Sequence, residues 1–287
     1  MTLVRPVRGS VREQKKSPDW LAGLLGLGRP IVMGVLNVTP DSFSDGGRFL
    51  DPATALEQAS RMMAEGADIL DIGAESTRPY GGAVAVPSAE EIRRLAPVLP
   101  AAVAQGIPVS VDTMKAAVAE WAIAAGAALV NDVWGLQRDS GMARLVAEHG
   151  VPVIIMHNRD AADPAIDIMA DISAFFSRSL EIARRAGIAR EKIVLDPGIG
   201  FGKTAEQSLT AIARIDELKS FGLPLLVGAS RKRFIDKVSP APPDQRLGGS
   251  IAAHVLAVLG GAAIIRTHDV AETVQALRVA AAIRSAR

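Results

Sequence analysis

The chain has 287 residues, of which 49% are hydrophobic and 22% are charged, so it can bury the core of one large α/β domain or of two small ones. A formal net charge of +1 argues against an extended nucleic-acid surface, and the absence of cysteine excludes disulfides, thiolate nucleophiles and cysteine-ligated metals. The longest apolar passage, Ile251 to Ile265, is interrupted by His254 and is too short to span a bilayer, which takes about 20 apolar residues. We therefore expect a cytoplasmic protein with no nucleic-acid and no membrane partner.

Residues 1–28 are predicted to form an N-terminal extension. They are basic and irregular, they lack the apolar stretch of a secretory signal, and they end in a short apolar patch from Trp20 to Leu27. We expect the extension to be either a tail or a lid over the bottom of the domain, and we assign it no chemistry.

From residue 29 to residue 287 the sequence predicts one domain in which strands and helices alternate. Short apolar runs are typical of buried strands, and Ala-rich amphipathic segments lie between them. The eight runs are Ile31–Leu36, Asp68–Ile72, Pro108–Val111, Ala128–Val130, Pro152–Met156, Lys192–Leu195, Pro224–Val227 and Ala263–Ile265. One helix is predicted to begin with a capping box made by Ser88 and Glu91.

This alternation predicts the fold class. Eight strands separated by helices imply parallel strands with right-handed crossovers, and a closed (β/α)8 barrel typically has about 250 residues, which matches this domain. The alternative is an open doubly wound sheet, whose phosphate loop carries G-x-G-x-x-G after the first strand. That motif is missing after Leu36, so we predict an α/β TIM barrel with a short N-terminal extension.

Polar residues follow nearly every predicted strand, where barrels place their catalytic groups. Asp112 and Asp196, with Asn131 between them in the chain, suit a heterocycle that presents adjacent N–H and NH2 donors, because an ionised carboxylate accepts two hydrogen bonds side by side. Paired carboxylates could instead hold a metal or act as the acid and base of a glycosidase. The nearby Lys232 and Arg266 favour the nitrogen heterocycle.

Two further segments are candidates for ligand binding. Arg266 and His268 lie just after the last predicted strand, in a part of the barrel that frequently binds phosphate. The segment Asp196–Thr204 superficially resembles a Walker A loop, but Pro197 stands where that motif needs glycine. We interpret it as a tight turn that lets a flat ligand approach, with Phe201 available to pack against the ligand.

The loops at residues 37–48 and 73–87 are unusually long for a compact barrel. Long connections of this kind are commonly lids or binding loops. Both are dense in Ser, Thr, Asp, Arg, Gly and Pro, so we expect them to be functional and to be mobile until a ligand binds.

Seven passages, most of them at predicted strand ends, form a recognisable set. They read NVTPDSFSDGG, ESTRP, SVDT, NDVWG, DPGIGFGKT, GASRK and GGSIAAHVLAVLGGAAIIRTHDV. In order and spacing they resemble the dihydropteroate synthase family of the folate pathway, and the first and fifth passages are highly specific. The resemblance implies a TIM-barrel transferase, usually a homodimer. Its reaction would join (7,8-dihydropterin-6-yl)methyl diphosphate to 4-aminobenzoate, giving 7,8-dihydropteroate and diphosphate, with sulfonamides as competitors.

The resemblance also implies a set of site residues and a Mg2+ cofactor. The catalytic residues would be Asn37, Asp45, Arg78, Lys232, Arg266 and His268. The substrate-binding residues would be Thr77, Arg78, Pro79, Asp112, Asn131, Val133, Met156, Asp196, Phe201, Gly228, Ser230, Lys232, Arg266 and His268.

Individual roles follow from the same resemblance. Asn37 would bind the Mg2+ that also meets the diphosphate, and Asp45 would help to order the closed state. The pterin ring would stack on Arg266, in a pocket lined by Val133 and Met156. Its polar contacts would be Asp112, Asn131, Asp196 and Lys232. The 4-aminobenzoate surroundings would be Thr77, Arg78, Pro79, Phe201 and Ser230, whereas Arg266 and His268 would hold the diphosphate.

The chemistry agrees with these roles. Negative charge that builds on a departing diphosphate can be stabilised by Mg2+, Arg266 and His268. Positive charge on the dihydropterin methylene is favoured beside Asp112 and Asp196, so an SN1-like cation attacked by the neutral arylamine is expected. Loop closure would exclude water, and no strong general base is required.

The sequence departs from the family at two places, and three other functions remain open. Tyr80-Gly81-Gly82 follows the second-loop motif, which leaves the shape of that loop undetermined, and His157-Asn158-Arg159 replaces a more usual His-Met. The rivals are a pterin-binding methyltransferase barrel, a non-catalytic relative and a generic phosphate-binding barrel. The first would share the acceptor pocket without needing the long loops, and the last cannot explain the first loop.

Overall fold

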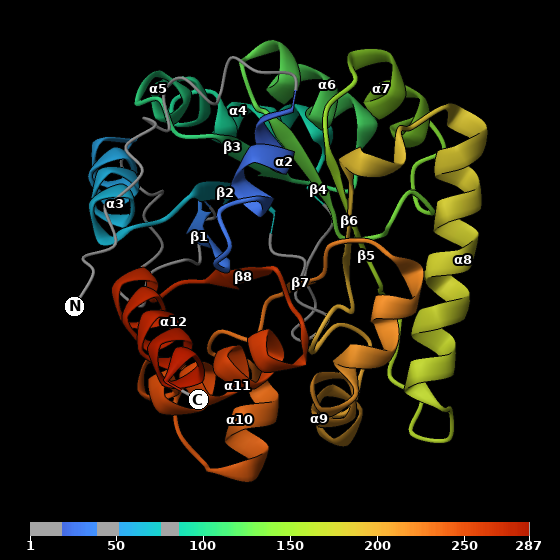
Figure 1. The fold of residues 1–287 in the computed structure, drawn as a ribbon. Helices are drawn as coiled ribbons and strands as arrows, with labels where there is room; N and C mark the ends of the chain where they lie inside the picture. Colours follow the sequence, from blue (N-terminus) through green and yellow to red (C-terminus); the bar gives the residue numbers. More distant parts are fainter. Residues whose placement is uncertain (1–18, 39–51, 76–85, 287) are drawn as a thin grey trace.

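Parallel strands form the centre of the molecule in the computed structural model, which describes residues 19–38, 52–75 and 86–286 (Figure 1). Within these residues all eight predicted runs are confirmed as strands. They are β1 (Ile31–Asn37), β2 (Ile69–Gly73), β3 (Val109–Asp112), β4 (Leu129–Asp132), β5 (Val153–Met156), β6 (Ile193–Asp196), β7 (Leu226–Val227) and β8 (Ile264–Thr267).

The strands close into a barrel. Their hydrogen-bonded order is β6-β5-β4-β3-β2-β1-β8-β7, and every pair is parallel. The two ends of this sheet meet through a bridge between Leu195 and Leu225, where the Leu195 amide donates to the Pro224 carbonyl at 2.9 Å. Proline has no N–H of its own to add to the ladder, so this pairing is short. The predicted TIM barrel is confirmed.

Helices surround the strands (Figure 1). The α-helices are α2 (Trp20–Leu25), α3 (Pro52–Glu65), α4 (Ser88–Leu95), α5 (Leu99–Ala104), α6 (Ala116–Ala124), α7 (Met142–His149), α8 (Ile168–Ala186), α9 (Ala205–Ala213), α10 (Arg233–Val238), α11 (Leu247–Gly260) and α12 (Val270–Ser285). Short 3-10 turns occupy η1 (Arg190–Lys192), η2 (Ile215–Phe221) and η3 (Pro243–Gln245). No helix of the described residues is long and apolar enough to cross a membrane.

Side chains cap some of these helices, but one predicted cap is wrong. Thr204 and Gln207 form a reciprocal capping box at the start of α9. The predicted box of Ser88 and Glu91 does not form, because Pro87 occupies the N-cap position and Ser88 is already helical. Glu91 instead lies buried and accepts from the Lys115 ammonium at 2.7 Å.

Alternation along the strands divides the core into an outer layer under the helices and a layer inside the barrel. The inner layer consists of apolar side chains from seven strands together with three from α2. They are Trp20, Leu21, Leu24, Ile31, Met33, Ile69, Leu129, Ile154, Val194, Leu226 and Ile264. The apolar patch of the N-terminal extension therefore packs into the end of the barrel opposite the strand carboxyl ends, which agrees with a lid over the bottom of the domain, and α2 lies over the strands in Figure 1. The boundary between residues 28 and 29 stays a prediction.

Candidate functional site

The inner face of the barrel changes from apolar to polar toward the carboxyl ends of the strands. Because side chains alternate along a strand, the residue two positions after an inward apolar residue also points inward. The inward positions nearest the carboxyl ends are Asn37, Asp71, Asp112, Asn131, Val133, Met156, Asp196, Gly228 and Arg266. All of these except Asp71 were predicted as site residues, so one mouth of the barrel gathers them.

Arg266 is the centre of this polar layer. Its Nε lies 2.6 Å from Asp71 Oδ2, and its Nη2 lies 2.8 Å from Asp112 Oδ2. Asn131 Nδ2 donates to the same Asp71 oxygen at 3.0 Å. Burial opposes the charge on Arg266, but the two carboxylates outweigh it and raise the pKa of the guanidinium above its ordinary value. β2, β3, β4 and β8 are thus linked across the inside of the barrel.

Asp71 is the site residue that sequence reasoning missed. Its side chain is fully buried in β2, within the apolar run Ile69–Gly73. The available signal was a carboxylate inside a strand that is otherwise apolar, since an ionisable side chain is almost never fully buried unless it is paired. Its partner, Arg266, lies 195 positions away in the sequence, and only closure of the barrel brings the two together.

Several buried acceptors in this layer lack a donor. Among the described residues, no donor lies within hydrogen-bond distance of Oδ1 of Asp71, Oδ1 of Asp112 or Oδ1 of Asn131, and Ser110 Oγ also lacks a partner. A buried acceptor without a donor costs about 1–3 kcal/mol, so such a cluster is expected to meet donors from a ligand. Burial raises the pKa of Asp112 to about 7, against the lowering effect of Arg266. The layer therefore suits a ligand edge rich in N–H groups.

Asp196 contributes to the same mouth from β6. Its Oδ1 accepts from the Gly198 amide at 2.7 Å, and burial raises the pKa of its carboxyl, against the lowering effect of the Lys232 charge. Gly198 has φ +64°, and a Cβ there would lie 1.9 Å from the His157 carbonyl oxygen. Only glycine fits this turn. The segment is thus the tight turn that we predicted.

Lys232 and Phe201 lie together beside Asp196. The Lys232 ammonium donates to the Ile199 carbonyl and lies 4.2 Å from the centre of the Phe201 ring. Gly200 has φ +81°, and a Cβ at this position would meet the Lys232 side chain at 3.2 Å. The turn after β6 therefore shapes the surroundings of both predicted contacts.

The loops after β7 and β8 meet at Ser230 and His268. The His268 amide donates to Ser230 Oγ at 3.2 Å, and His268 Nδ1 lies 3.0 Å from the same oxygen. Gly228 lies against the Arg266 side chain, since a Cβ there would be 3.6 Å from Arg266 Cβ. Arg231, in contrast, pairs with Asp269 at the start of α12. The predicted anion-binding residues are thus adjacent to the acceptor layer.

The remaining predicted site residues divide into described and undescribed ones. Asn37 ends β1 opposite Gly73, and a Cβ on Gly73 would lie 3.2 Å from Asp112 Cβ, so the end of β1 and the acceptor layer are close neighbours. Met156 and Val133 are buried at the ends of β5 and β4. The other four, Asp45, Thr77, Arg78 and Pro79, lie outside the described residues.

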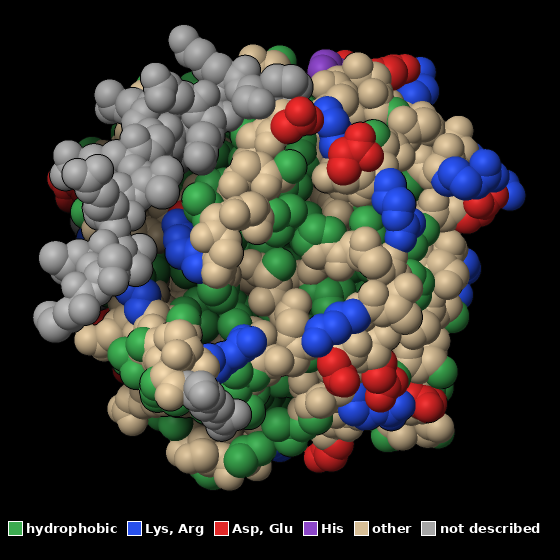
Figure 2. All heavy atoms as spheres, in the orientation of Figure 1, with side chains coloured by type: hydrophobic (Ala, Val, Ile, Leu, Met, Phe, Trp, Pro, Cys, Tyr) green, Lys and Arg blue, Asp and Glu red, His purple; other side chains and the backbone are tan. Residues whose placement is uncertain are grey.

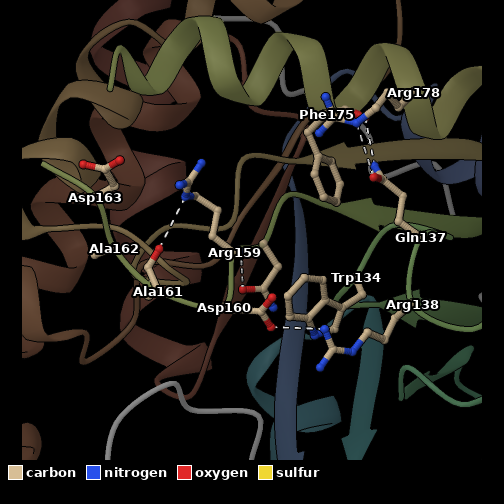
Figure 3. Close-up of a pocket in the computed structure, with 11 residues that line it drawn as sticks. Trp134, Gln137, Arg138, Arg159, Asp160, Ala161, Ala162, Asp163, Phe175 and Arg178 are labelled. Atoms are coloured by element: carbon tan, nitrogen blue, oxygen red, sulfur yellow. Dashed lines mark hydrogen bonds and ion pairs between the residues drawn. The ribbon is translucent and has the colours of Figure 1, made fainter. Parts of the chain in front are cut away.

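A groove of about 490 Å³ lies beside this mouth, between the segments that follow β4 and β5 and the helix α8 (Figure 3). Arg138 stacks over Trp134 at 4.5 Å and pairs with Asp160 at 3.1 Å across the groove. None of the predicted substrate contacts lines it. The groove is therefore separate from the acceptor layer inside the barrel.

Comparisons with known proteins agree with this geometry. The family described as "Pterin binding enzyme" matches residues 33–268. A curated dihydropteroate synthase of Clostridium beijerinckii is 45% identical over 253 residues, which cover 88% of this chain and 93% of that protein.

Solved structures of the same kind are similar over about nine-tenths of this chain. A dihydropteroate synthase of Clostridium difficile, crystallised in the presence of pteroic acid, is 49% identical with a TM-score of 0.85, covering 89% of this chain and 97% of that one. The Xanthomonas albilineans enzyme with 4-aminobenzoic acid is 45% identical, also with a TM-score of 0.85, covering 90% and 94%.

Proposed function

We propose that this chain, which belongs to the dihydropteroate synthase family and is a transferase, condenses (7,8-dihydropterin-6-yl)methyl diphosphate with 4-aminobenzoate. The products would be 7,8-dihydropteroate and diphosphate. The observation that carries the proposal is the layer of buried acceptors without donors around Arg266. The relatives that were solved with pteroic acid and with 4-aminobenzoic acid support the same substrates.

The pterin ring would bind inside the barrel mouth. Its 2-amino group and ring N–H groups are donors, and they match the acceptor oxygens of Asp112, Asn131 and Asp196. Arg266 uses Nε and Nη2 for the two aspartates, and its planar face remains suited to stacking on a flat ring. A sulfonamide, which carries the same para-substituted aniline as 4-aminobenzoate, would compete for the neighbouring position beside Phe201 and Ser230.

The diphosphate would bind at the mouth beside His268 and Ser230, with Arg266 on the side of the pterin. Mg2+ usually takes few protein ligands and fills its remaining positions with water and substrate phosphate oxygens. No group of three histidine or acidic side chains that could form a dedicated cage occurs among the described residues, and the half-buried amide of Asn37 at the end of β1 suits such a substrate-borne ion. When bound, Mg2+ would neutralise charge on the diphosphate oxygens.

The reaction would proceed through cleavage of the bond between the methylene carbon and the diphosphate oxygen. The bonding electrons leave with the diphosphate, where His268 and Arg266 offset the new negative charge. The methylene would become cationic in a mouth that holds the carboxyls of Asp112 and Asp196, and these would stabilise the positive charge in their ionised form. The 4-aminobenzoate nitrogen then forms the new C–N bond and afterwards loses a proton, so this SN1-like step needs no strong base in the protein.

Formation of dihydropteroate by the purified chain tests this function directly. The protein is incubated with both substrates, with and without Mg2+, and product and diphosphate are quantified. Stoichiometric dihydropteroate and diphosphate are expected, and the rate should fall when Mg2+ is removed. Pteroic acid binding without any turnover would instead support the non-catalytic relative. In a separate incubation with methyltetrahydrofolate and a corrinoid, transfer of the methyl group to the corrinoid would support the methyltransferase.

Asn37→Ala is expected to weaken Mg2+-dependent diphosphate binding while pterin binding survives. Loss of one metal ligand should reduce diphosphate affinity at least about tenfold, which corresponds to about 1.4 kcal/mol. Isothermal titration with inorganic diphosphate, with and without Mg2+, measures the effect, and pteroic acid provides the control titration. Equal diphosphate affinity in the variant and the original chain, with Mg2+ present, would remove Asn37 from this role.

The chain is also proposed to form a homodimer through α11 and α12. These two helices pack against each other, and they expose Leu256 (60%), Leu259 (49%), Val279 (53%) and Ile283 (62%). Hydrophobic side chains are visible on this side of the molecule in Figure 2, and α11 carries no Asp, Glu, Lys or Arg. A two-fold axis would place this apolar surface against its own copy and bury it on both partners.

Replacing Leu256 and Ile283 together with glutamate is expected to convert the dimer into a monomer. Two charges on each partner would have to be desolvated at the centre of the interface. Light scattering coupled to gel filtration gives the mass, and Leu27→Glu, at an exposed leucine next to α2, is the matched control. A dimeric mass for the double variant would place the interface elsewhere.

A further inference from the structure

Lys203 lies beneath the turn that follows β6, although its position in Gly-Phe-Gly-Lys suggests an exposed cation. Its side chain is 2% exposed, and its ammonium faces the Gly198 carbonyl at 2.9 Å and the Phe201 carbonyl at 3.1 Å. The third neighbour is His157 Nδ1 at 2.6 Å. The three N–H groups of an ammonium match these three acceptors.

The carbonyls of this turn are shared between two lysines. Those of Gly198 and Phe201 face Lys203, whereas that of Ile199, between them, accepts from Lys232. Backbone that reverses direction so quickly requires left-handed residues, and Gly198, Gly200 and Gly202 have φ of +64°, +81° and +54°. The position of Lys232 in the site therefore depends on a turn that Lys203 holds from below.

His157 connects this lysine to Asp196. The His157 amide donates to the Asp196 carbonyl at 2.9 Å, while its ring accepts from Lys203. Burial lowers the pKa of His157 to about 3, with the Lys203 charge adding to the effect, so the ring is neutral. If Nδ1 accepts, the proton resides on Nε2, which lies 3.0 Å from Asp171 Oδ2.

The chain of contacts ends at the surface. Asp171 Oδ2 also accepts from Arg159 Nη1 at 2.9 Å, and Arg159 lines the groove shown in Figure 3. Phe175 lines the same groove and packs edge-on against the His157 ring at 4.9 Å. The imidazole is thus held on its ring edge and at both nitrogens.

Burial lowers the pKa of Lys203 well below its ordinary value, while the Asp196 charge acts in the opposite direction.

We infer that Lys203 is a positioning residue for pterin binding, and that His157 is the acceptor that orients it. Its three contacts hold the turn so that the Asp196 carboxylate and the carbonyl that receives Lys232 face the barrel mouth. The inference rests on the proposed function only in taking a pterin as the ligand of that mouth.

The test compares Lys203→Met with a matched lysine variant. Lys192 also donates to a backbone carbonyl, that of Gly150, but at the opposite end of β6, so Lys192→Met removes the same kind of contact away from the mouth. Titrations with pteroic acid and with Mg2+ and inorganic diphosphate are made on both variants and the original chain. We expect Lys203→Met to weaken pteroic acid at least about tenfold and diphosphate less than twofold, and Lys192→Met to change neither.

Two substitutions of His157 separate orientation from packing. Asparagine keeps an acceptor near the place of Nδ1 and loses the contact with Asp171, whereas glutamine keeps a polar group near the place of Nε2 and loses the contact with Lys203. His157→Asn should therefore bind pteroic acid within about threefold of the original chain, and His157→Gln should lose at least about tenfold. Thermal unfolding of all variants identifies any that do not fold.

The outcomes are distinguishable from failure of the proposed function. If the original chain does not bind pteroic acid, the proposed function fails before any variant is considered. If it does bind, unchanged pteroic acid affinity in Lys203→Met overturns the inference. Equal losses for pteroic acid and diphosphate, or a stronger loss in His157→Asn than in His157→Gln, overturn it as well.

Discussion

Replacing Asp71 with leucine is expected to lower the free energy of unfolding by about 3 kcal/mol and to abolish pteroic acid binding. Asp71 is fully buried, and its Oδ2 accepts from both Arg266 and Asn131. Breaking a buried ion pair by removing one partner costs about 3–5 kcal/mol, and the low end applies because Arg266 keeps its contact with Asp112. Urea unfolding measures the change as a lower midpoint at an unaltered slope.

The double variant Asp71→Leu with Arg266→Met is the control for this mechanism. Arg266→Met removes the guanidinium that has lost one of its two carboxylate partners, and apolar replacement of a buried pair is often neutral or stabilising. It also removes the Arg266 contact of Asp112. The double variant should therefore recover part of the lost stability but none of the pteroic acid affinity. A double variant less stable than Asp71→Leu would show that the remaining contact of Arg266 with Asp112 contributes more than removal of the guanidinium gains.

Asp196→Asn is expected to weaken pteroic acid binding about thirtyfold, or about 2 kcal/mol, without lowering stability. The new amide oxygen can keep the 2.7 Å bond from the Gly198 amide, so the turn survives. The NH2 group then replaces the other carboxylate oxygen and presents donors to the donors of the pterin. Isothermal titration with pteroic acid gives the affinity, and thermal unfolding gives the stability.

Asp132→Asn provides the opposite result for comparison. Asp132 is also a buried aspartate at a strand end, but it points away from the barrel interior, and its two oxygens accept from the Trp134 and Leu136 amides at 2.9 and 2.7 Å. An amide there can keep only one of these bonds, so stability should fall while pteroic acid affinity stays within about twofold. If Asp196→Asn behaved like Asp132→Asn, the role of Asp196 would be structural.

Most of the site was predictable because strand periodicity and strand ends are local properties. Ile31, Leu129 and Ile264 point into the barrel. Residues an even number of positions further along the same strand point the same way, and these are Asn37, Asn131 and Arg266 respectively. Parallel strands then bring those faces to one mouth. The capping box at Ser88 failed for the complementary reason: Pro87 takes the N-cap position, and Glu91 pairs with the partly buried Lys115 of another loop.

By itself, the sequence determined the barrel, the family and the residues at the strand ends, because each depends on short-range spacing or on contiguous motifs. Only the tertiary structure decided that Asp71 is the partner of Arg266 and that Lys203 lies beneath the turn after β6 rather than on the surface. Asp71 and Arg266 are 195 positions apart, and Lys203 lies 46 positions from its contact His157, so no short-range pattern predicts these two contacts. Their energies depend on burial, since the low-dielectric interior makes pairing of a charge necessary.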